Sequence, residues 1–319
     1  MRVYAFDIGG SSIKHALIQV ANGNASITDR FPSIQLDTFT LRELVTRLTA
    51  ALHGHFESTG EPLSTIGIST TGSVDDSGRV LRAGHFQDYQ NTSWSEILTD
   101  RFQQVEHVLT INDGRASTWA EYTLHRSGSA PFVHFVLGTG IGGGIVSDGA
   151  LVPGADSAAG GFGHIKVSQT SDIPCSCKRF GCVETFAAAP AIVRSYVKKA
   201  GIDPESVQLA QVVAASRDGN TAAKAAFEEA GEWLGMAISN VMNMLNPSAI
   251  TLGGGLALAA SEAIEDTPDS GFLKAAVETA RGLALPRIAT KTVIKPAEYG
   301  NDGGLIGAAL LATSTGRRK

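Results

Sequence analysis

The sequence predicts an α/β protein made of two domains. Strand patterns alternate with helix patterns along the chain, and three of the expected strands end in glycine-rich turns. The arrangement also occurs twice: Phe6-Asp7-Ile8-Gly9-Gly10 and Leu137-Gly138-Thr139-Gly140 each close a first strand, and each precedes antiparallel strand signals. Because alternating strands and helices pack as layered sheets, we expect two related halves with a cleft between them.

Composition and charge fit a globular protein. The chain has 319 residues, of which 43% are hydrophobic and 18% charged, which is enough for two domains with sizeable cores. A formal net charge of -5 argues against general binding to nucleic acid or to anionic membranes. No apolar run reaches the ~20 residues that span a bilayer, and Asp7 interrupts any signal-peptide core. We therefore expect a cytoplasmic protein that binds neither nucleic acid nor membrane.

The first half opens with strands and tight turns, and two helices follow. Asn22-Gly23-Asn24 is a hairpin signal. Thr40-Leu41-Arg42-Glu43 and Ser93-Trp94-Ser95-Glu96 have the capping-box pattern, and each should begin a helix. The expected strands cover residues 3–7, 13–20, 25–31, 66–69 and 105–111, and the fourth of them ends at Thr70-Thr71-Gly72.

A second block starts near Pro131 and becomes helical after Val183. Asp148-Gly149 marks a hairpin, and the segment 151–182, rich in Gly, Pro, Cys and Ser, should be loop. The longest helix should run from Thr221 to Leu245 and end before Pro247, because the residue before a proline disfavours helical geometry. Strands are expected at 132–137 and 250–252, with a last helix after Asn301-Asp302-Gly303-Gly304.

Ile111-Asn112-Asp113-Gly114 lies at the end of an expected strand and before a run of helical composition. A carboxylate at a strand end, where an α/β sheet opens into a crevice, can act as a general base, and Asn112 could hydrogen-bond a polar substrate. Asn and Asp are also ordinary helix N-caps, so these four residues alone are compatible with both roles.

Three strand ends carry glycine-rich turns, at Asp7–Ser12, Gly138–Gly144 and Gly253–Gly255. Glycine lets the backbone approach a phosphate and present several N–H donors to it. None of the turns continues into the Gly-Lys-Ser/Thr of a Walker loop, and the second precedes a strand rather than the helix of a dinucleotide fingerprint. Three such turns favour nucleotide binding, with Asp7 either holding Mg²⁺ through water or capping its own turn.

All three cysteines of the chain, Cys175, Cys177 and Cys182, fall between positions 175 and 182, which argues against a disulfide framework. With His164 they form a set that suits tetrahedral Zn²⁺, and because no position stays open, the zinc would be structural. One ring nitrogen of His164 would bind the metal and leave the other for substrate. The alternative is free buried cysteines beside a core histidine. Glu184 could accept hydrogen bonds from sugar hydroxyls, or could be a helix first-turn acid favoured by the dipole.

In order along the chain, these motifs resemble those of the ROK family of sugar kinases, within the actin-like ATPase (ribonuclease H-like) fold. Asp7-Ile8-Gly9-Gly10-Ser11 resembles its first phosphate loop, Gly138–Gly144 its second, and Gly253-Gly254-Gly255 its adenosine loop. Gly163-His164, followed by Cys175-x-Cys177-x-x-x-Gly181-Cys182-x-Glu184, resembles its zinc signature. The resemblance implies two α/β domains with an interdomain cleft: 1–122, completed by a C-terminal helix at 302–319, and 123–301 with the zinc loop.

The resemblance implies an ATP-dependent kinase acting on the 6-hydroxyl of a hexose or N-acetylhexosamine, with N-acetylmannosamine and glucose favoured. Asp113 would be the catalytic base, and Mg²⁺ near Asp7 would neutralise developing charge. The implied substrate-binding residues are Gly72, Asn112, Asp113, His164 and Glu184. The implied binding residues for ATP and Mg²⁺ are Asp7, Gly9, Gly10, Ser11, Ser12, Gly138, Thr139, Gly140, Gly142, Gly143, Gly254 and Gly255. The implied ligands of a structural Zn²⁺ are His164, Cys175, Cys177 and Cys182.

Two positions depart from the family pattern. The family usually has Gly after the second Cys, where this chain has Lys178, and Glu three residues before the zinc His, where it has Gly161. That Glu contacts the sugar, and some bacterial N-acetylmannosamine kinases of the family lack it, so Gly161 shifts the expectation away from plain glucokinase. A non-catalytic sugar-binding or regulatory ROK protein is the alternative. Family regulators carry an N-terminal helix-turn-helix, for which a phosphate loop at residue 7 leaves no room. The family also implies a homodimer.

Overall fold

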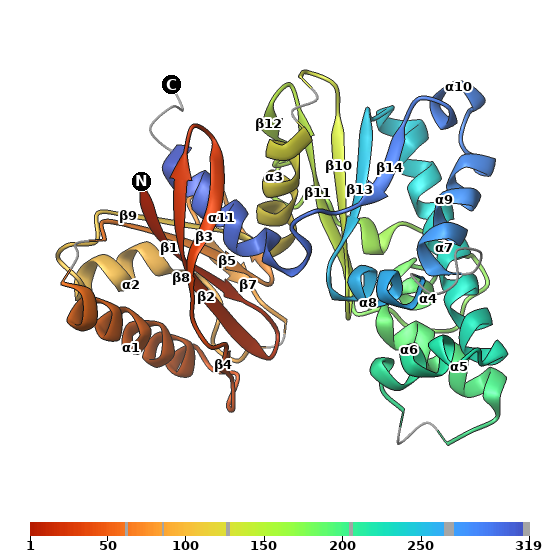
Figure 1. Ribbon diagram of the computed structural model, residues 1–319, viewed down its shortest axis with the longest axis horizontal. Helices are drawn as coiled ribbons and strands as arrows, with labels where there is room; N and C mark the ends of the chain where they lie inside the picture. Colours follow the sequence, from red (N-terminus) through yellow and green to blue (C-terminus); the bar gives the residue numbers. More distant parts are fainter. Residues whose placement is uncertain (61–62, 85, 126–127, 204–206, 265–270, 315–319) are drawn as a thin grey trace. The chain divides into compact units, whose positions relative to one another are not determined.

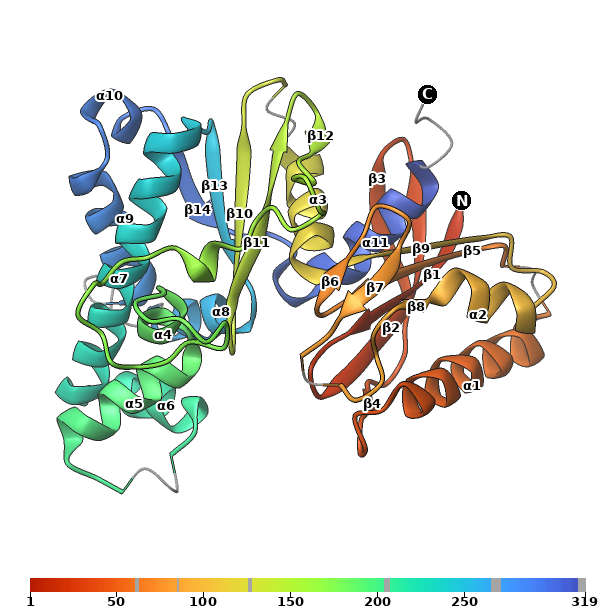
Figure 2. The same cartoon turned by 180° about the vertical axis from the view of Figure 1, so that it is seen from behind.

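The structure is a computed structural model that describes residues 1–60, 63–84, 86–125, 128–203, 207–264 and 271–314. The chain divides into two compact units, each built of strands and helices (Figures 1 and 2). The first unit combines Met1–Arg126, Leu151–Ala159 and Asp302–Lys319, and the second combines Ser127–Ala150 and Gly160–Asn301. No helix in the described part of the chain is long and apolar enough to cross a membrane.

A six-stranded sheet forms the centre of the first unit. Its strands are β1 (Arg2–Ile8), β2 (Ser12–Ala21), β3 (Asn24–Arg30), β4 (Ile34–Gln35), β5 (Thr65–Thr70) and β9 (His107–Asn112). The order is β3-β2-β1-β5-β9, with β4 paired to β2. β1, β5 and β9 run parallel, and β2 is antiparallel to β1 and β3. The carboxyl ends of the parallel strands therefore meet at one edge, where Ile8, Thr70 and Asn112 are in register.

The connections of this sheet follow local sequence signals. Asn22 and Gly23, with φ of 53° and 75°, join β2 to β3 in the predicted hairpin. The strand predicted at 105–111 is β9, which is displaced toward the C-terminus and starts at His107. A second, small sheet follows β5 and consists of β6 (Ser73–Val74), β7 (Arg79–Arg82) and β8 (Thr92–Ser93).

One face of the large sheet is covered by α1 (Leu41–Thr59) and α2 (Trp94–Arg101), as Figure 1 shows. Each helix begins at its predicted N-cap, because Thr40 accepts a hydrogen bond from the backbone of Glu43, and Ser93 from that of Glu96. The reciprocal half of the capping box, however, was wrong. The Glu43 carboxylate instead accepts from the backbone N–H groups of residues 37–39, and the Glu96 carboxylate pairs with a guanidinium on β7.

The other face packs against α11 (Gly303–Ser314), which also contacts α3 (Asp113–His125). A side chain at Gly67 on β5 would come within 2.7 Å of the Ala308 backbone, so sheet and helix lie in close contact. α11 begins at Gly303 rather than after Gly304. Cβ atoms at these two positions would meet Ser117 Oγ at 2.3 Å and Asp7 Oδ1 at 2.7 Å, which accounts for both glycines. Residues 315–319 of the predicted helix lie outside the described residues.

The sheet of the second unit repeats the topology of the first. Its strands are β10 (Phe132–Leu137), β11 (Ile141–Ser147), β12 (Ala150–Leu151), β13 (Ala249–Gly253) and β14 (Val293–Pro296). The order β12-β11-β10-β13-β14 matches β3-β2-β1-β5-β9, with the antiparallel pair and the two parallel pairs at equivalent places. The internal repeat predicted from the sequence is therefore confirmed. The predicted hairpin at Asp148-Gly149 joins β11 to β12, with φ of 51° and 74°.

Helices form most of the rest of the second unit. They are α4 (Glu184–Ala187), α5 (Ala189–Ala200), α6 (Leu209–Arg217), α7 (Thr221–Leu245), α8 (Gly255–Ile264), α9 (Phe272–Leu283) and α10 (Pro286–Ala289). α7 has the predicted bounds, and it packs side by side with α9 (Figures 1 and 2). Side chains at Gly231 and Gly235 would come within 2.4 Å and 2.6 Å of carbonyl oxygens of α9, which explains two glycines inside a long helix.

The segment between β12 and α4 is largely without regular structure, as its composition predicts. It contains one turn of 3₁₀ helix, η1 (Phe162–His164), and two isolated bridges, Lys166↔Cys182 and Pro174↔Phe180. A second short 3₁₀ helix, η3 (Gly300–Asp302), precedes α11. The position of the cysteines therefore depends on a few backbone bonds and on side-chain contacts.

Candidate functional site

Asn112 and Asp113 divide the two roles that the sequence left open. Asn112 closes β9 and its Oδ1 accepts from the Arg115 backbone N–H at 3.1 Å, so Asn112 caps α3. Its Nδ2 donates to Asp113 Oδ1 and to the Gly72 carbonyl, both at 2.8 Å. Asn112 therefore takes the cap role and ties the Asp113 carboxylate to Gly72, which follows β5.

Asp113 is a half-buried carboxylate at the first position of α3. The Gly114 backbone N–H donates to its Oδ1 at 2.8 Å. Burial, followed by the nearby charge of Asp7, raises the pKa of Asp113 to about 6, against the lowering effect of its hydrogen bonds. A carboxylate with a raised pKa holds a proton more readily than an ordinary Asp and still ionises near neutral pH, as a general base requires.

Asp7 lies near the end of β1, on the same edge of the sheet. Its Oδ1 accepts from Ser69 Oγ at 2.7 Å, and its Oδ2 lies 3.3 Å from Lys14 Nζ. These partners belong to neighbouring strands, so the side chain of Asp7 does not cap its own turn. The turn that follows leaves Gly10 and Ser11 exposed, with a Gly9 N–H to Ser12 C=O bond of 2.9 Å across it.

Lys14 and Ser69 were missed by the sequence reasoning. Lys14 is the antiparallel partner of Asp7 on β2, and Ser69 is its parallel partner on β5. The turn between the first two predicted strands was located correctly, so counting back from it along the hairpin would have paired Lys14 with Asp7. Ser69 carried no such signal, because parallel pairing between distant strands cannot be counted from a turn.

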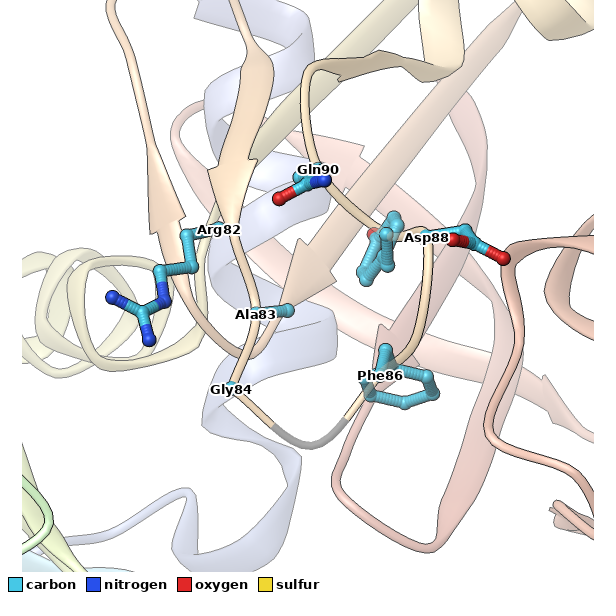
Figure 3. A pocket seen from close by; sticks show the side chains of 7 residues that line it. Arg82, Ala83, Gly84, Phe86, Asp88 and Gln90 are labelled. Atoms are coloured by element: carbon cyan, nitrogen blue, oxygen red, sulfur yellow. The ribbon is translucent and has the colours of Figure 1, made fainter.

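A pocket of about 190 Å³ lies at the end of β7 in the first unit (Figure 3). Gly72 touches its wall, since a side chain there would lie 2.2 Å from the Arg82 carbonyl oxygen. Tyr89 connects it to β5 through a 3.0 Å hydrogen bond to Thr70. Figure 3 shows Phe86 and Asp88 across from Ala83 and Gly84. The full lining is Arg82, Ala83, Gly84, Phe86, Asp88, Tyr89 and Gln90, a mixed polar and aromatic surface that suits a polar ligand.

Some of the glycines at 138–144 in the second unit are needed for protein packing, and others lie beside open space. Side chains at Gly140 and Gly143 would meet Glu184 Oε2 at 2.7 Å and the His134 carbonyl oxygen at 1.9 Å, so protein packing accounts for them. A Cβ atom at Gly138 or Gly142 would have no other atom within 4 Å, so the backbone there has open space beside it for a ligand. Gly142–Gly144 also lie in β11 rather than in the turn.

The turn at Gly253–Gly255 has a structural reason of its own. Gly254 has φ of 91°, and a side chain there would meet the Leu137 carbonyl oxygen at 2.3 Å. Gly255 is the first residue of α8, so the turn leads into the N-terminus of a helix. A helix N-terminus can bind a phosphate or another anion, although the glycines alone do not identify one.

The side chains of His164, Cys175, Cys177 and Cys182 come together. Their ligand atoms all lie within 4.8 Å of one another, with Cys175 Sγ to His164 Nδ1 at 3.5 Å and Cys177 Sγ to Cys182 Sγ at 3.6 Å. In a tetrahedral zinc site, S–S and S–N pairs would be about 3.8 Å and about 3.5 Å apart. The donor set therefore fits Zn²⁺ in both chemistry and spacing. None of the three cysteines forms a disulfide in the described part of the chain.

A tight turn and one lysine hold this cluster. The Cys175 carbonyl accepts from the Lys178 backbone N–H at 2.8 Å, and Lys178 has φ of 63°, the left-handed conformation in which the family has glycine. Lys166 was missed by the sequence reasoning: its Nζ donates to Cys182 Sγ at 2.9 Å and to the Phe180 carbonyl at 2.7 Å. Nothing in the local sequence indicates that contact.

Glu184 points back to the loops rather than to its own helix. Its Oε2 accepts from the Ile141 backbone N–H at 3.0 Å, and its Oε1 accepts from Ser176 Oγ at 2.8 Å. Glu184 is nevertheless the first residue of α4, so the first-turn position of the helix-dipole role is also observed. Gly161 is exposed, and the atom nearest to a Cβ built there is a His164 ring carbon at 4.0 Å, so the place of the usual family Glu is open space.

Comparison with known proteins finds sugar kinases that are similar over nearly the whole chain. The chain is 31% identical to a glucokinase from Halalkalibacterium halodurans over 327 residues, covering 96% of this chain and 93% of the relative. It is 28% identical to an N-acetylmannosamine kinase from Escherichia coli over 318 residues, covering 98% of both. The crystal structure of a ROK family glucokinase from Streptomyces griseus with glucose and AMPPNP superposes with a TM-score of 0.80 at 26% identity, covering 98% of this chain and 100% of that one.

These likenesses run over nearly the whole length of each chain. The fold is therefore the actin-like ATPase fold of the ROK sugar kinases, as the sequence predicts. A profile described as ROK family matches residues 3–315. With the motifs, the topology and the profile in agreement, the chain belongs to the ROK family.

Proposed function

We propose that this protein is an ATP-dependent kinase that phosphorylates the 6-hydroxyl of a hexose or N-acetylhexosamine. The observation that carries the proposal is Asp113, a half-buried carboxylate at a strand end with a pKa of about 6 and Asp7 nearby. Relatives named glucokinase, N-acetylmannosamine kinase and kanosamine kinase support sugar phosphorylation as the reaction.

In the proposed reaction Asp113 accepts the proton of the sugar hydroxyl. The hydroxyl oxygen forms a bond to the γ-phosphorus of ATP while the bond to the β,γ-bridging oxygen breaks, so that sugar phosphate and ADP leave. Asn112 keeps the carboxylate oriented through its 2.8 Å bond, which avoids a reorientation step during reaction. His164, Glu184 and Gly72 would bind the sugar along with Asn112 and Asp113.

ATP would bind at the glycine turns Gly9–Ser12, Gly138–Gly142 and Gly254-Gly255. Among these, Gly10, Gly138 and Gly142 have open space beside the backbone. Asp7 suits Mg²⁺ held through water, because this ion binds one or two carboxylates together with phosphate oxygens. Bound Mg²⁺ would neutralise the charge of the transferring phosphoryl group. Lys14, 3.3 Å from Asp7, adds a positive charge at the same place.

The cluster of His164, Cys175, Cys177 and Cys182 would hold one structural Zn²⁺. Four protein ligands leave no position for a catalytic water, so the metal would organise the loop and orient His164. Elemental analysis of protein purified without chelator should find about one zinc per chain, as one four-ligand site requires. Finding no zinc in such a preparation would remove this part of the proposal.

The sugar can be identified by an ATP-coupled assay on glucose, mannose, N-acetylglucosamine and N-acetylmannosamine, followed by ³¹P–¹H NMR of the product. The open space at Gly161 supports a preference for N-acetylmannosamine over glucose, because the family carboxylate that contacts the sugar is missing there. Sugar binding without ADP release for any member of the panel would instead support a non-catalytic or regulatory ROK protein.

The assembly state is part of the same proposal. We propose a homodimer on the strength of the family resemblance alone. Light scattering on the purified chain should give about twice the monomer mass of 33.2 kDa; a monomer mass across the micromolar range would contradict it.

A further inference from the structure

The carboxylate of Glu184 is held on both of its oxygens by loops that come from different parts of the second unit. On one side the Ile141 backbone N–H, at the start of β11, donates to Oε2 at 3.0 Å. On the other side Ser176 Oγ donates to Oε1 at 2.8 Å. Gly140 and Gly163 leave room for this position, since side chains there would lie 2.7 Å and 3.0 Å from Oε2.

Ser176 lies between Cys175 and Cys177 in the metal loop, but its own side chain is not a candidate ligand. The Ser176 hydroxyl is exposed, so a water molecule could serve as its hydrogen-bond partner in place of Glu184. At 2.8 Å the contact with Glu184 Oε1 has the length of a good hydrogen bond, whereas Cys175 Sγ lies 3.7 Å from the same hydroxyl.

Cys175 provides the only other contact from this loop to the Glu184 carboxylate among the described residues. Its thiol lies 3.7 Å from Oε1, a long distance for a donor that is weak in any case. Ser176 Oγ, at 2.8 Å from Oε1, is therefore the closer donor from the metal loop to Glu184.

We propose that Ser176 is a positioning residue that transmits the order of the metal loop to Glu184 and thereby sets the affinity for sugar. This inference rests on the proposed role of Glu184 in binding sugar hydroxyls. A carboxylate has about four lone-pair sites, and the Ile141 and Ser176 bonds occupy one on each oxygen. The two bonds fix the orientation of the carboxylate, so its remaining lone pairs point in a defined direction. Sugar binding then does not have to order this side chain, which favours affinity.

The test compares Ser176→Ala and Ser176→Thr with Ser171→Ala, which removes a hydroxyl from the same loop. Ser171 Oγ accepts from the Ile173 backbone N–H at 3.2 Å, and among the described residues it forms no hydrogen bond to Glu184 or to the cluster. Ser176→Ala should raise the KM and the calorimetric Kd for the best sugar of the panel about tenfold, the usual loss for a hydrogen bond to a charged group. The kcat and the zinc content should stay within about twofold of wild type.

Ser176→Thr keeps the hydroxyl, so it should restore the sugar affinity to within about twofold of wild type. A purely structural role for Ser176 would lower zinc content or melting temperature and would affect kcat and KM together. Unchanged sugar affinity in Ser176→Ala, or an equal loss in Ser171→Ala, would overturn the inference. If the wild-type chain neither phosphorylates nor binds any sugar of the panel, the proposed function fails. If Glu184→Gln binds sugar normally, the role of Glu184 in that function fails. Both results can be told apart from a failure of the Ser176 inference.

Discussion

The same topology carries different chemistry in the two units. Asp7 is the next-to-last residue of β1 and faces Lys14 across the hairpin. The equivalent position of the second unit is Val136 on β10, which faces Gly142. The repeated fold therefore places a turn at the same point twice, but only the first unit puts a carboxylate there. Topology supplies open turns at strand ends, and single residues decide what each turn can do.

The two units also differ in how their functional groups are held. Asp7, Asn112 and Asp113 lie on strand ends or at a helix start, so strand register and one cap define their positions. The cysteines and His164 lie in a segment of little regular structure, where a few turns and the Lys166 contact define them. The strand-end residues of the first unit should therefore keep their positions when a single contact is lost. The positions of the cysteines and His164 should depend on the metal and on residues that contact its ligands.

The largest expected effect is the loss of kcat when Asp113 is replaced. Asp113→Asn should lower kcat by at least about 100-fold, the usual contribution of a positioned base, while sugar binding by calorimetry stays close to wild type. Asp100→Asn, an exposed acid on α2 of the same unit, is the matched control and should leave kcat unchanged. A variant that kept more than about a tenth of the wild-type rate would contradict the base role.

The next prediction concerns Lys166, which contacts Cys182 in the second unit, and it sharpens the contrast between the two units. Lys166→Met should weaken zinc binding about tenfold or more, because loss of a residue that contacts a metal ligand commonly costs that much affinity. The readout is competition with a chromophoric chelator on the intact protein, so it does not depend on activity. Lys178→Met removes the same charge from an exposed position of the loop and serves as control; equal losses in both variants would mean that net charge, not the contact, matters.

The pH dependence should report the environment of Asp113. A base works only when deprotonated, and burial next to Asp7 raises its pKa to about 6. We therefore expect kcat/KM to be level above that pH and to fall about tenfold per unit below it. Rate measurements between pH 4.5 and 8 in buffers of constant ionic strength would show the limb. A value of kcat/KM that stays level down to about pH 5 would mean that the rate depends on an ordinary aspartate or on no carboxylate at all.

The smallest effect is on stability. The folded pKa of Asp113, about 6, lies above the unfolded value of ~3.9, so stability that the protonated group contributes below ~3.9 is lost as pH rises through about 6. Asp113→Asn avoids that loss and should melt about 2 °C higher than wild type at pH 8. The gain should vanish at pH 4. A scan by fluorimetry at both pH values checks it, and a lower melting temperature at pH 8 would show that the carboxylate stabilises the fold.

Several features could be predicted because they depend on neighbours in sequence. The hairpin at Asn22-Gly23 and the end of α7 before Pro247 follow from local backbone preferences, and both are observed. The capping boxes were half right: the N-cap bonds of Thr40 and Ser93 form, but the acids find better partners elsewhere. A long acidic side chain can reach several donors, so its partner is not a local property.

The sequence by itself determined the fold class, the repeat, the glycine turns and the Cys/His set, because each rests on periodicity or spacing along the chain. Only the tertiary structure decided that Ser69 holds Asp7, that Lys166 contacts Cys182, and that Ser176 contacts Glu184. The pocket beside Gly72 is likewise formed by loops whose approach no local pattern encodes. Such contacts join loops or parallel strands, whose mutual register is set by the packing of the whole unit and not by any turn between them.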